Sequence, residues 1–253
     1  MHLLRKLAVF PFLALASVLL FCAPATPVRA EDLPEFRPAL LTRSRRSLVN
    51  QIDAEGLMKR GQGNAIVMFS CGISTNGDAY GMQVYRESPH SEMLREELLG
   101  KYQRAYYEPA VFQHHRTNVW IDGTVSFAVV NGKPHLRIFL NQEEDALTTG
   151  KDFIAPQYAI VPGNTKFKGF FWPTGAPGHA GVASLTLEID ETGHVVSGKI
   201  AYEHPPGLGF GAAALGPVVD ALFIPGFRNG KPVRCRTDWP LIYSGPGRQM
   251  STG

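Results

Sequence analysis

Two stretches of the chain, 116 residues apart, share one order of turns, apolar strands and a helix. When the sequence is shifted by this distance without a gap, Gly77 aligns with Gly193 and Pro109 aligns with Pro225. Few residues are identical, but apolar residues align with apolar residues through two strands, the helix and the return strand. A repeat of this kind has to be recognised before any fold is assigned. We therefore predict an internal duplication; the alternative is chance agreement between two stretches that both use glycine and proline at turns.

The first copy combines a β-hairpin with a helix and further strands. Apolar residues alternate over 66–73, an Asn-Gly turn follows, and the strand returns over 79–86, which is the pattern of a hairpin. A helix with one apolar stripe comes next and ends before Pro109. Two further strands, 119–129 and 136–140, are joined by a second Asn-Gly turn. A short helix is also predicted ahead of the hairpin, from residue 47 to about residue 61.

The second copy repeats this order. Apolar residues alternate around a Thr-Gly turn near residue 193, and a helix is predicted over 212–223. The segment LFIPGFRNGKPVRC, residues 222–235, ends this helix at Pro225 and reverses the chain through two glycines. Pro232 begins the final strand, where a missing N–H does little harm, so the strand is predicted at a sheet edge.

These patterns predict an α+β protein of two tandem, small, two-layer units. In each unit, an antiparallel three-stranded sheet packs against one or two helices. The predicted boundaries are a signal peptide at 1–30, an extended lead-in at 31–46, a first unit at 47–145 and a second unit at 146–253. On length alone, one large or two small domains fit equally well, so the division depends on the duplication.

The first thirty residues have the order of a secretory signal peptide. A basic start at Arg5 and Lys6 precedes an apolar run over 7–23 and a small-residue end at 28–30. We expect cleavage before Glu31 and a periplasmic location. The alternative is an uncleaved inner-membrane anchor with the rest of the chain facing the periplasm, because the apolar run reaches the lower limit of about 17–25 residues for a span.

Charge gives no support for a nucleic-acid or anionic-lipid partner. Three of the 25 basic residues and none of the 22 acidic residues lie in 1–30, so the remainder carries 22 of each. The sequence pI of about 8.8 therefore belongs partly to the predicted signal. We predict no nucleic-acid partner and, after cleavage, no membrane span.

Several features of the second copy, in order and spacing, resemble the C-terminal domain of TonB-family proteins. They are an aromatic-proline entry at Trp172-Pro173, Gly181 at the start of a strand, Asp190 and Gly193 at the hairpin, the segment LFIPGFRNGKPV, and an alternating return to Tyr243. The resemblance covers about residues 155–244. The first copy resembles the same domain through NGD and YYEPA, but FQHHRTN replaces the glycine and proline of its later turn.

This resemblance implies a protein that binds peptides rather than an enzyme. Domains of this family bind outer-membrane receptor peptides, which can add as a strand beside the sheet, where an edge strand offers unpaired N–H and C=O groups. The matching edge here is PVRCRTDWPLIY. We therefore expect an envelope protein or an extended peptide as partner, contacted by Val233, Arg234, Arg236, Asp238 and Trp239. The alternative is that these charges only keep the edge soluble, and a homodimer through exposed edges also stays open.

The chain departs from the family in its lead-in. A TonB energy transducer keeps a membrane anchor and a long proline-rich spacer, whereas the lead-in of about 16 residues here reaches only about 55 Å when fully extended. We therefore predict an exported binding protein, with an anchored TonB-type transducer for outer-membrane transport as the alternative.

No residue pattern predicts catalysis, a metal or another cofactor. The adjacent His114 and His115 point to opposite faces of a strand, and the sequence has no H-E-x-x-H or Cys-x-x-Cys spacing. A G-x-S-x-G elbow and a phosphate-loop lysine are also absent from the sequence. An unrecognised periplasmic enzyme remains a third hypothesis. Cys71 and Cys235 are predicted as free thiols on the apolar faces of separate copies, although export leaves a disulfide open.

Overall fold

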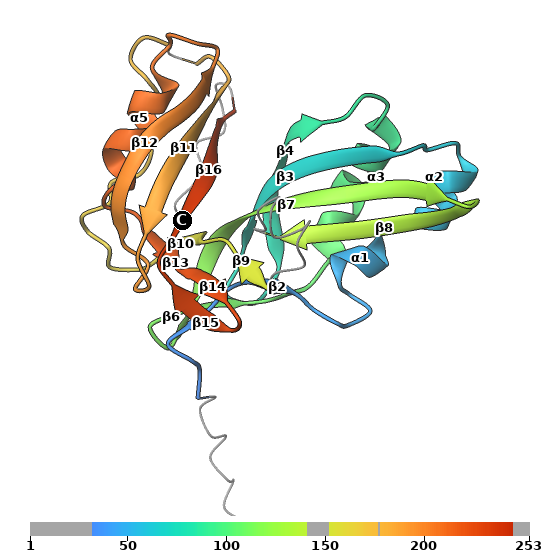
Figure 1. Cartoon of the computed structure of the whole chain (residues 1–253), viewed down its shortest axis with the longest axis horizontal. Coiled ribbons are helices and arrows are strands. Elements are labelled where there is room, and N and C mark those ends of the chain that lie inside the picture. Colours follow the sequence, from blue (N-terminus) through green and yellow to red (C-terminus); the bar gives the residue numbers. More distant parts are fainter. Residues whose placement is uncertain (1–31, 141–151, 177, 245–253) are drawn as a thin grey trace, which may run out of the picture. The chain divides into compact units, whose positions relative to one another are not determined.

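Strands dominate the described part of the chain. The computed structural model describes residues 32–140, 152–176 and 178–244 (Figure 1); the predicted signal peptide lies outside these ranges. The helices are α1 (Leu48–Gln51), α2 (Ala54–Lys59), α3 (Glu92–Lys101), the 3-10 helix η1 (Tyr102–Arg104) and α5 (Phe210–Val218). The strands are β1 (Phe36–Arg37), β2 (Leu40–Leu41), β3 (Ala65–Ile73), β4 (Ala79–Glu87), β5 (Tyr107–Glu108), β6 (Ala110–Phe112), β7 (His115–Val130), β8 (Lys133–Leu140), β9 (Phe153–Ile154), β10 (Gln157–Ile160), β11 (Gly181–Ile189), β12 (Val195–His204), β13 (Leu222–Ile224), β14 (Gly226–Arg228), β15 (Lys231–Val233) and β16 (Cys235–Tyr243).

The prediction of an α+β protein with two separate three-stranded units is wrong. Strands make up 48% of the structure and helices 16%, and the described strands form four sheets. The largest sheet has eight strands and takes β10 and β13 from the C-terminal copy. The physical reason is the length of β7: with 16 residues it pairs with β3, β6, β8 and β10, so its ladder extends beyond three strands.

Two helix predictions also fail in their extent. The stretch 47–61 forms only the short helices α1 and α2, and α1 lacks a side-chain cap. The helix predicted over 212–223 begins at Phe210 and ends at Val218, and its last predicted residues form β13. Pro217 lies in the last turn of this helix. The hydrogen bond that its missing N–H cannot make is therefore lost at the end of α5 and not in its middle.

The 116-residue offset recurs in strand boundaries and in strand register. It relates β3 to β11 and β6 to β14 residue for residue. Ile73 pairs with Val119 between β3 and β7, and the residues at the same offset, Ile189 and Cys235, pair between β11 and β16. The hairpins β3–β4 and β11–β12 are both antiparallel. The structure thus repeats one strand arrangement at the offset predicted from the sequence.

The hairpin turns of the two copies make the same backbone contact. The Tyr107 N–H donates to the Gly77 carbonyl at 2.8 Å, and the Phe223 N–H donates to the Gly193 carbonyl at 2.9 Å. The two glycines have φ values of 85° and 86°. A Cβ on either would meet the carbonyl oxygen of the residue that donates to it. Glycine is therefore required twice, at equivalent positions, by conformation and by space.

The later turn also matches, although its sequence differs between the copies. Gln113 and His114 have φ values of 48° and 65°, and their counterparts Asn229 and Gly230 have values of 51° and 72°. The first copy therefore forms this left-handed turn without glycine, which is uncommon for ordinary residues. The FQHHRTN segment changes the turn's residues but not its geometry.

Two apolar clusters form the interior. One lies between the eight-stranded sheet and helices α1–α3, and the other contains residues of β11, β16 and α5. Trp120 of β7 packs on the second cluster, while Ile224 of β13 belongs to the first. The predicted lead-in contributes β1 and β2, and the Ala39 backbone exchanges hydrogen bonds of 2.7 and 2.9 Å with the Gln157 side chain. The two copies therefore interlock.

Candidate functional site: the margins of the C-terminal sheet

The sheet β12–β11–β16 has two outer strands. Helix α5 packs against β11 and β12 on one face (Figure 1). Among the described residues, β12 and β16 each pair only with the central strand β11. Each outer strand therefore presents one row of backbone groups that no described strand bonds, and such a row can accept a further strand.

The two margins differ in regularity. The β11–β16 ladder runs through nine successive residue pairs without a register shift. The β11–β12 ladder has shifts between Ser184 and Leu185 and between Glu188 and Ile189. Bulges and a lysine such as Lys199 are the means by which natural proteins make an edge strand a poor template. The β16 margin is therefore the more regular template for strand addition, although Pro240 leaves one position on it without an N–H.

The strand equivalent to β16 in the first copy is paired on both sides. On the side of β7 away from β3, β8 pairs with residues Gly123 to Val130 and β10 pairs with residues Asn118 to Trp120. At the offset of 116, these stretches correspond to residues 239–246 and 234–236. No described strand lies beside the part of this region that the structure describes.

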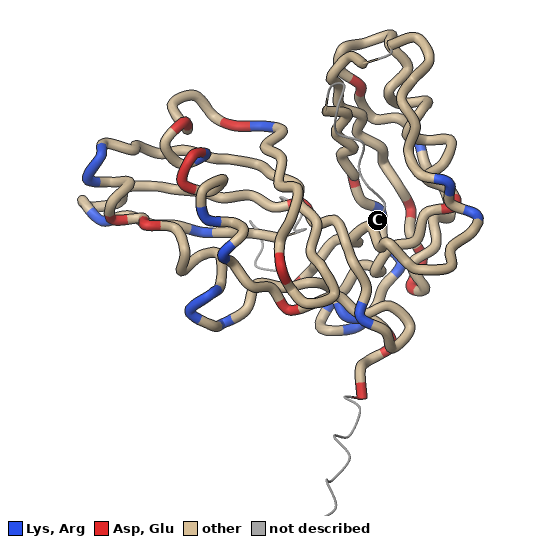
Figure 2. Tube along the Cα trace, turned by 180° about the vertical axis from the view of Figure 1, so that it is seen from behind, with Lys and Arg blue, Asp and Glu red and all other residues tan. Residues whose placement is uncertain are grey.

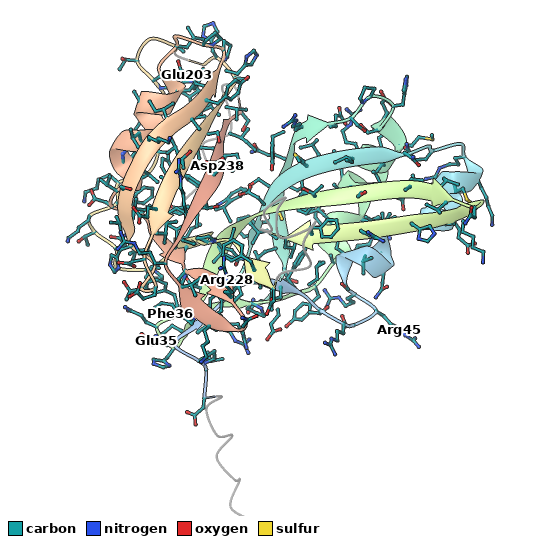
Figure 3. All side chains as sticks on the ribbon, in the orientation of Figure 1. Glu35, Phe36, Arg45, Glu203, Arg228 and Asp238 are labelled. Atoms are coloured by element: carbon teal, nitrogen blue, oxygen red, sulfur yellow. The ribbon has the colours of Figure 1, made fainter. Side chains whose placement is uncertain are left out.

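The charged residues predicted to contact a partner are engaged within their own sheet. The Arg234 guanidinium lies 2.8 Å from the Glu188 carboxylate, and hydrogen bonding to this arginine lowers the pKa of Glu188. The Thr186 hydroxyl donates to Asp238 at 2.6 Å, and Figure 3 shows Asp238 on the C-terminal sheet. Arg236 is exposed beside Glu188. These contacts agree with the alternative that the charges keep the outer face solvated.

The two apolar members of the predicted site lie in different surroundings. Val233 is half-buried at the end of β15 and packs on Phe153 and Ala155. Trp239 is only 5% exposed, and its ring packs against those of Tyr158 and Phe223. The Trp239 side chain is therefore buried within the chain, and its backbone groups, which alternate with those of Pro240, face the paired strand β11.

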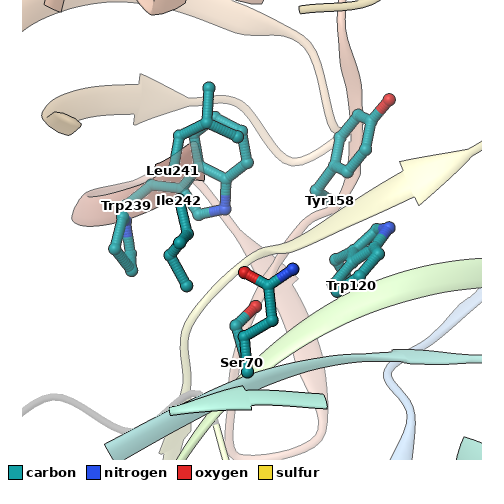
Figure 4. A pocket seen from close by; sticks show the side chains of 8 residues that line it. Ser70, Trp120, Tyr158, Trp239, Leu241 and Ile242 are labelled. Carbon is teal, nitrogen blue, oxygen red and sulfur yellow. The ribbon is translucent and has the colours of Figure 1, made fainter. Parts of the chain in front are cut away.

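A narrow crevice borders the β16 margin, and sequence reasoning missed it. Trp239, Leu241 and Ile242 lie on one side of it and Trp120 and Tyr158 on the other (Figure 4), and Ser70, Gln83 and Pro240 complete its lining. Its volume of about 20 Å³ suits a single water molecule. The Gln83 amide donates to the Ser244 hydroxyl at 3.2 Å and so links the two sides. Only the tertiary fold brings these residues together; the sole signal in the sequence was Pro240, which is typical of an edge strand.

An ionisable group lies next to this crevice. Asp122 pairs across the sheet with Ser70, one of the residues that line the crevice. Burial raises the pKa of the Asp122 carboxyl to about 7, and a hydrogen bond with Ser70 opposes this shift. The carboxyl therefore changes charge near neutral pH, which no pattern in the sequence indicated.

The remaining chemistry of the described residues is sparse. Neither Cys71 nor Cys235 forms a disulfide, as predicted, and burial raises the pKa of Cys71, which keeps it protonated. Within the described ranges, no group of three or more potential metal ligands is present. Figure 2 shows acidic and basic residues interspersed along the traced chain.

The loop GLGFG, residues 207–211, binds a carboxylate of its own chain. The Glu203 side chain accepts hydrogen bonds of 2.7 Å from the Gly207 and Gly211 N–H groups, and Gly211 lies in the first turn of α5. These backbone contacts lower the pKa of Glu203. Figure 3 places Glu203 at the end of the C-terminal sheet. The Glu203 carboxylate therefore fixes this loop at the start of α5.

None of the helices in the described ranges has the length and apolar character needed to cross a membrane. Comparisons of the chain with known protein families, curated proteins and solved structures found no match.

Proposed function

We propose that the protein is an exported, periplasmic binding protein, related to the TonB C-terminal domain, that takes an extended segment of an envelope protein beside β16. The resemblance of residues 155–244 to that domain supports the kind of partner. Backbone hydrogen bonds supply affinity in this mode of recognition, and neighbouring side chains supply specificity.

One observation carries the proposal. The first copy pairs the outer side of β7 with β8 and β10, whereas the equivalent side of β16 has no strand partner among the described residues. The equivalent strand β7 is paired on both sides. A further strand can therefore add at the regular margin of β16, which has no strand partner among the described residues. The regular nine-pair register of β16 supports this margin over that of β12.

Site-specific photo-crosslinking in the exported protein tests the proposal. A photoreactive residue replaces Ile242 on the β16 margin in one variant and Tyr202 on β12 in a matched variant. We expect an envelope-protein adduct at position 242 that maps to an extended segment, and none at position 202. Adducts at position 202 alone, or at neither position, would contradict binding at β16.

The N-terminus of the mature protein separates this proposal from an anchored transducer. We expect the sequence of the purified periplasmic protein to begin at Glu31. A protein that retains Met1 and sediments with the inner membrane would favour the TonB-type transducer instead.

A further inference from the structure

The duplication supplies a template for the segment that β16 would bind. Strand β8 runs antiparallel to β7, and Leu140, Ile138 and Leu136 lie opposite Gly123, Val125 and Phe127 in turn. Because β3–β7 and β11–β16 share one register at the offset of 116, these three β7 positions correspond to residues 239, 241 and 243. The β8 register therefore transfers onto β16 residue by residue.

Strand β8 has an alternating pattern that follows the two faces of its sheet. Leu136 and Ile138 are half-buried and Leu140 is buried, and all three pack on the apolar cluster of the first copy. Of the two residues between them, Arg137 is exposed and Phe139 is half-buried. An apolar residue at every second position is what a strand needs when one of its faces covers a core.

Strand β16 also covers a core with the apolar side chains of one face. Trp239, Leu241 and Tyr243 all point into the second cluster, each no more than 5% exposed. Half-buried aromatic rings cover this side of the strand: Phe170 lies 5.4 Å from the Trp239 ring, and Trp172 lies 5.5 Å from the Tyr243 ring. A segment added beside β16 would place every second side chain next to these rings.

We infer that the bound segment runs antiparallel to β16 and carries apolar residues at three alternating positions, opposite Trp239, Leu241 and Tyr243. This inference rests on the proposed function and specifies the ligand of the same site. The intervening side chains face the crevice, where Gln83 and Ser70 offer amide and hydroxyl groups and Trp120 and Tyr158 offer aromatic rings.

The crevice has to widen for this segment to enter. Its present volume suits one water molecule, and the Gln83–Ser244 hydrogen bond links its sides. One neutral hydrogen bond between partly buried groups stabilises an arrangement only modestly. Replacing Gln83 with alanine removes this link without touching β16, so the Q83A variant is expected to bind the segment more tightly than the wild type.

The chain's own β8 sequence provides the probe. A dye-labelled KPHLRIFL peptide is titrated into the full-length protein, with a peptide of the same composition in which Leu, Ile and Leu are consecutive as the control. We expect saturable binding of the alternating peptide to wild type or Q83A, and binding at least about tenfold weaker for the control.

A proline variant locates the binding margin. Pro240 has no N–H, and a proline is tolerated in a ladder where its nitrogen faces away from the paired strand; the Ile242 N–H, two residues on, then faces the same free side. Ile242→Pro should weaken peptide binding about fivefold to tenfold. Ile200→Pro, at a β12 position opposite Leu185 whose N–H also faces away from β11, should leave binding unchanged. Far-UV circular dichroism of both variants checks that they fold.

Spin labels on the peptide read its direction. In the inferred orientation, a nitroxide at the peptide's N-terminus broadens NMR signals near Tyr243, and one at its C-terminus broadens the Trp239 signals. The opposite result, or equal affinity for both peptides, would overturn this inference while leaving strand addition at β16 in place. If neither peptide binds wild type or Q83A and position 242 still crosslinks, only the ligand pattern fails; if crosslinking fails too, the proposed function fails with it.

Discussion

Replacing Asp122 with asparagine should remove a large part of the pH dependence of folding stability. Asp122 lies on β7, opposite Ser70 of β3 in the eight-stranded sheet, and the residue is half-buried. Its neighbours are the Ser70 hydroxyl, the Cys71 thiol and the Tyr85 phenol, and burial also raises the pKa of both Cys71 and Tyr85.

The size of the effect follows from the shift in pKa. The carboxyl titrates at about 7 in the folded chain, against an ordinary value of 3.8. The folded state therefore binds this proton more tightly, and its stability falls as the pH rises from about 4 to about 7. With about 1.4 kcal/mol per unit, the full loss is about 4 kcal/mol, of which about 2–3 kcal/mol falls between pH 5 and pH 8.

Urea unfolding at pH 5 and pH 8, followed by tryptophan fluorescence, measures this difference. The wild type should lose about 2–3 kcal/mol over this interval through Asp122, and the Asp122→Asn variant should lack that loss. Asp220→Asn, at an exposed position, is the matched control and should keep the wild-type profile. An Asp122→Asn variant with the same pH profile as the wild type would refute the assignment of this titration to Asp122.

Three further predictions concern the duplicated turns, the α5 loop and the thiols. Gly77→Ala and Gly193→Ala should each lower the free energy of unfolding by about 2 kcal/mol or more, because both add a strained φ and a clash with a backbone carbonyl; markedly different losses would argue against equivalent turns. Glu203→Gln should lower thermal stability by about 1 kcal/mol through weaker contacts to the α5 loop, and an unchanged melting curve would contradict that role. A thiol reagent should label Cys71 only after unfolding, whereas Cys235 is half-buried and should react first; rapid native labelling of both thiols would exclude this order.

The sequence alone was sufficient for the local elements and for their repetition. Alternation and turn residues located the hairpins β3–β4 and β11–β12, and the glycines at 77 and 193 marked turns whose geometry needs a residue without Cβ. Such features depend on neighbouring residues only. Pro232 likewise predicted an edge strand, but it lies in β15, at the edge of the sheet β15–β14–β9, and not in the final strand β16.

Tertiary structure decided how the copies share strands and which margin stays unpaired. Nothing local in β7 shows that β10 will pair with it, because that choice depends on backbone groups more than 30 residues away meeting in space. The raised pKa of Asp122, the burial of Trp239 and the crevice beside Gln83 have the same origin: each is set by what packs against the residue. Periodicity assigns a side chain to one face of a strand, but only long-range packing determines whether that face or that edge meets water, a core or another strand.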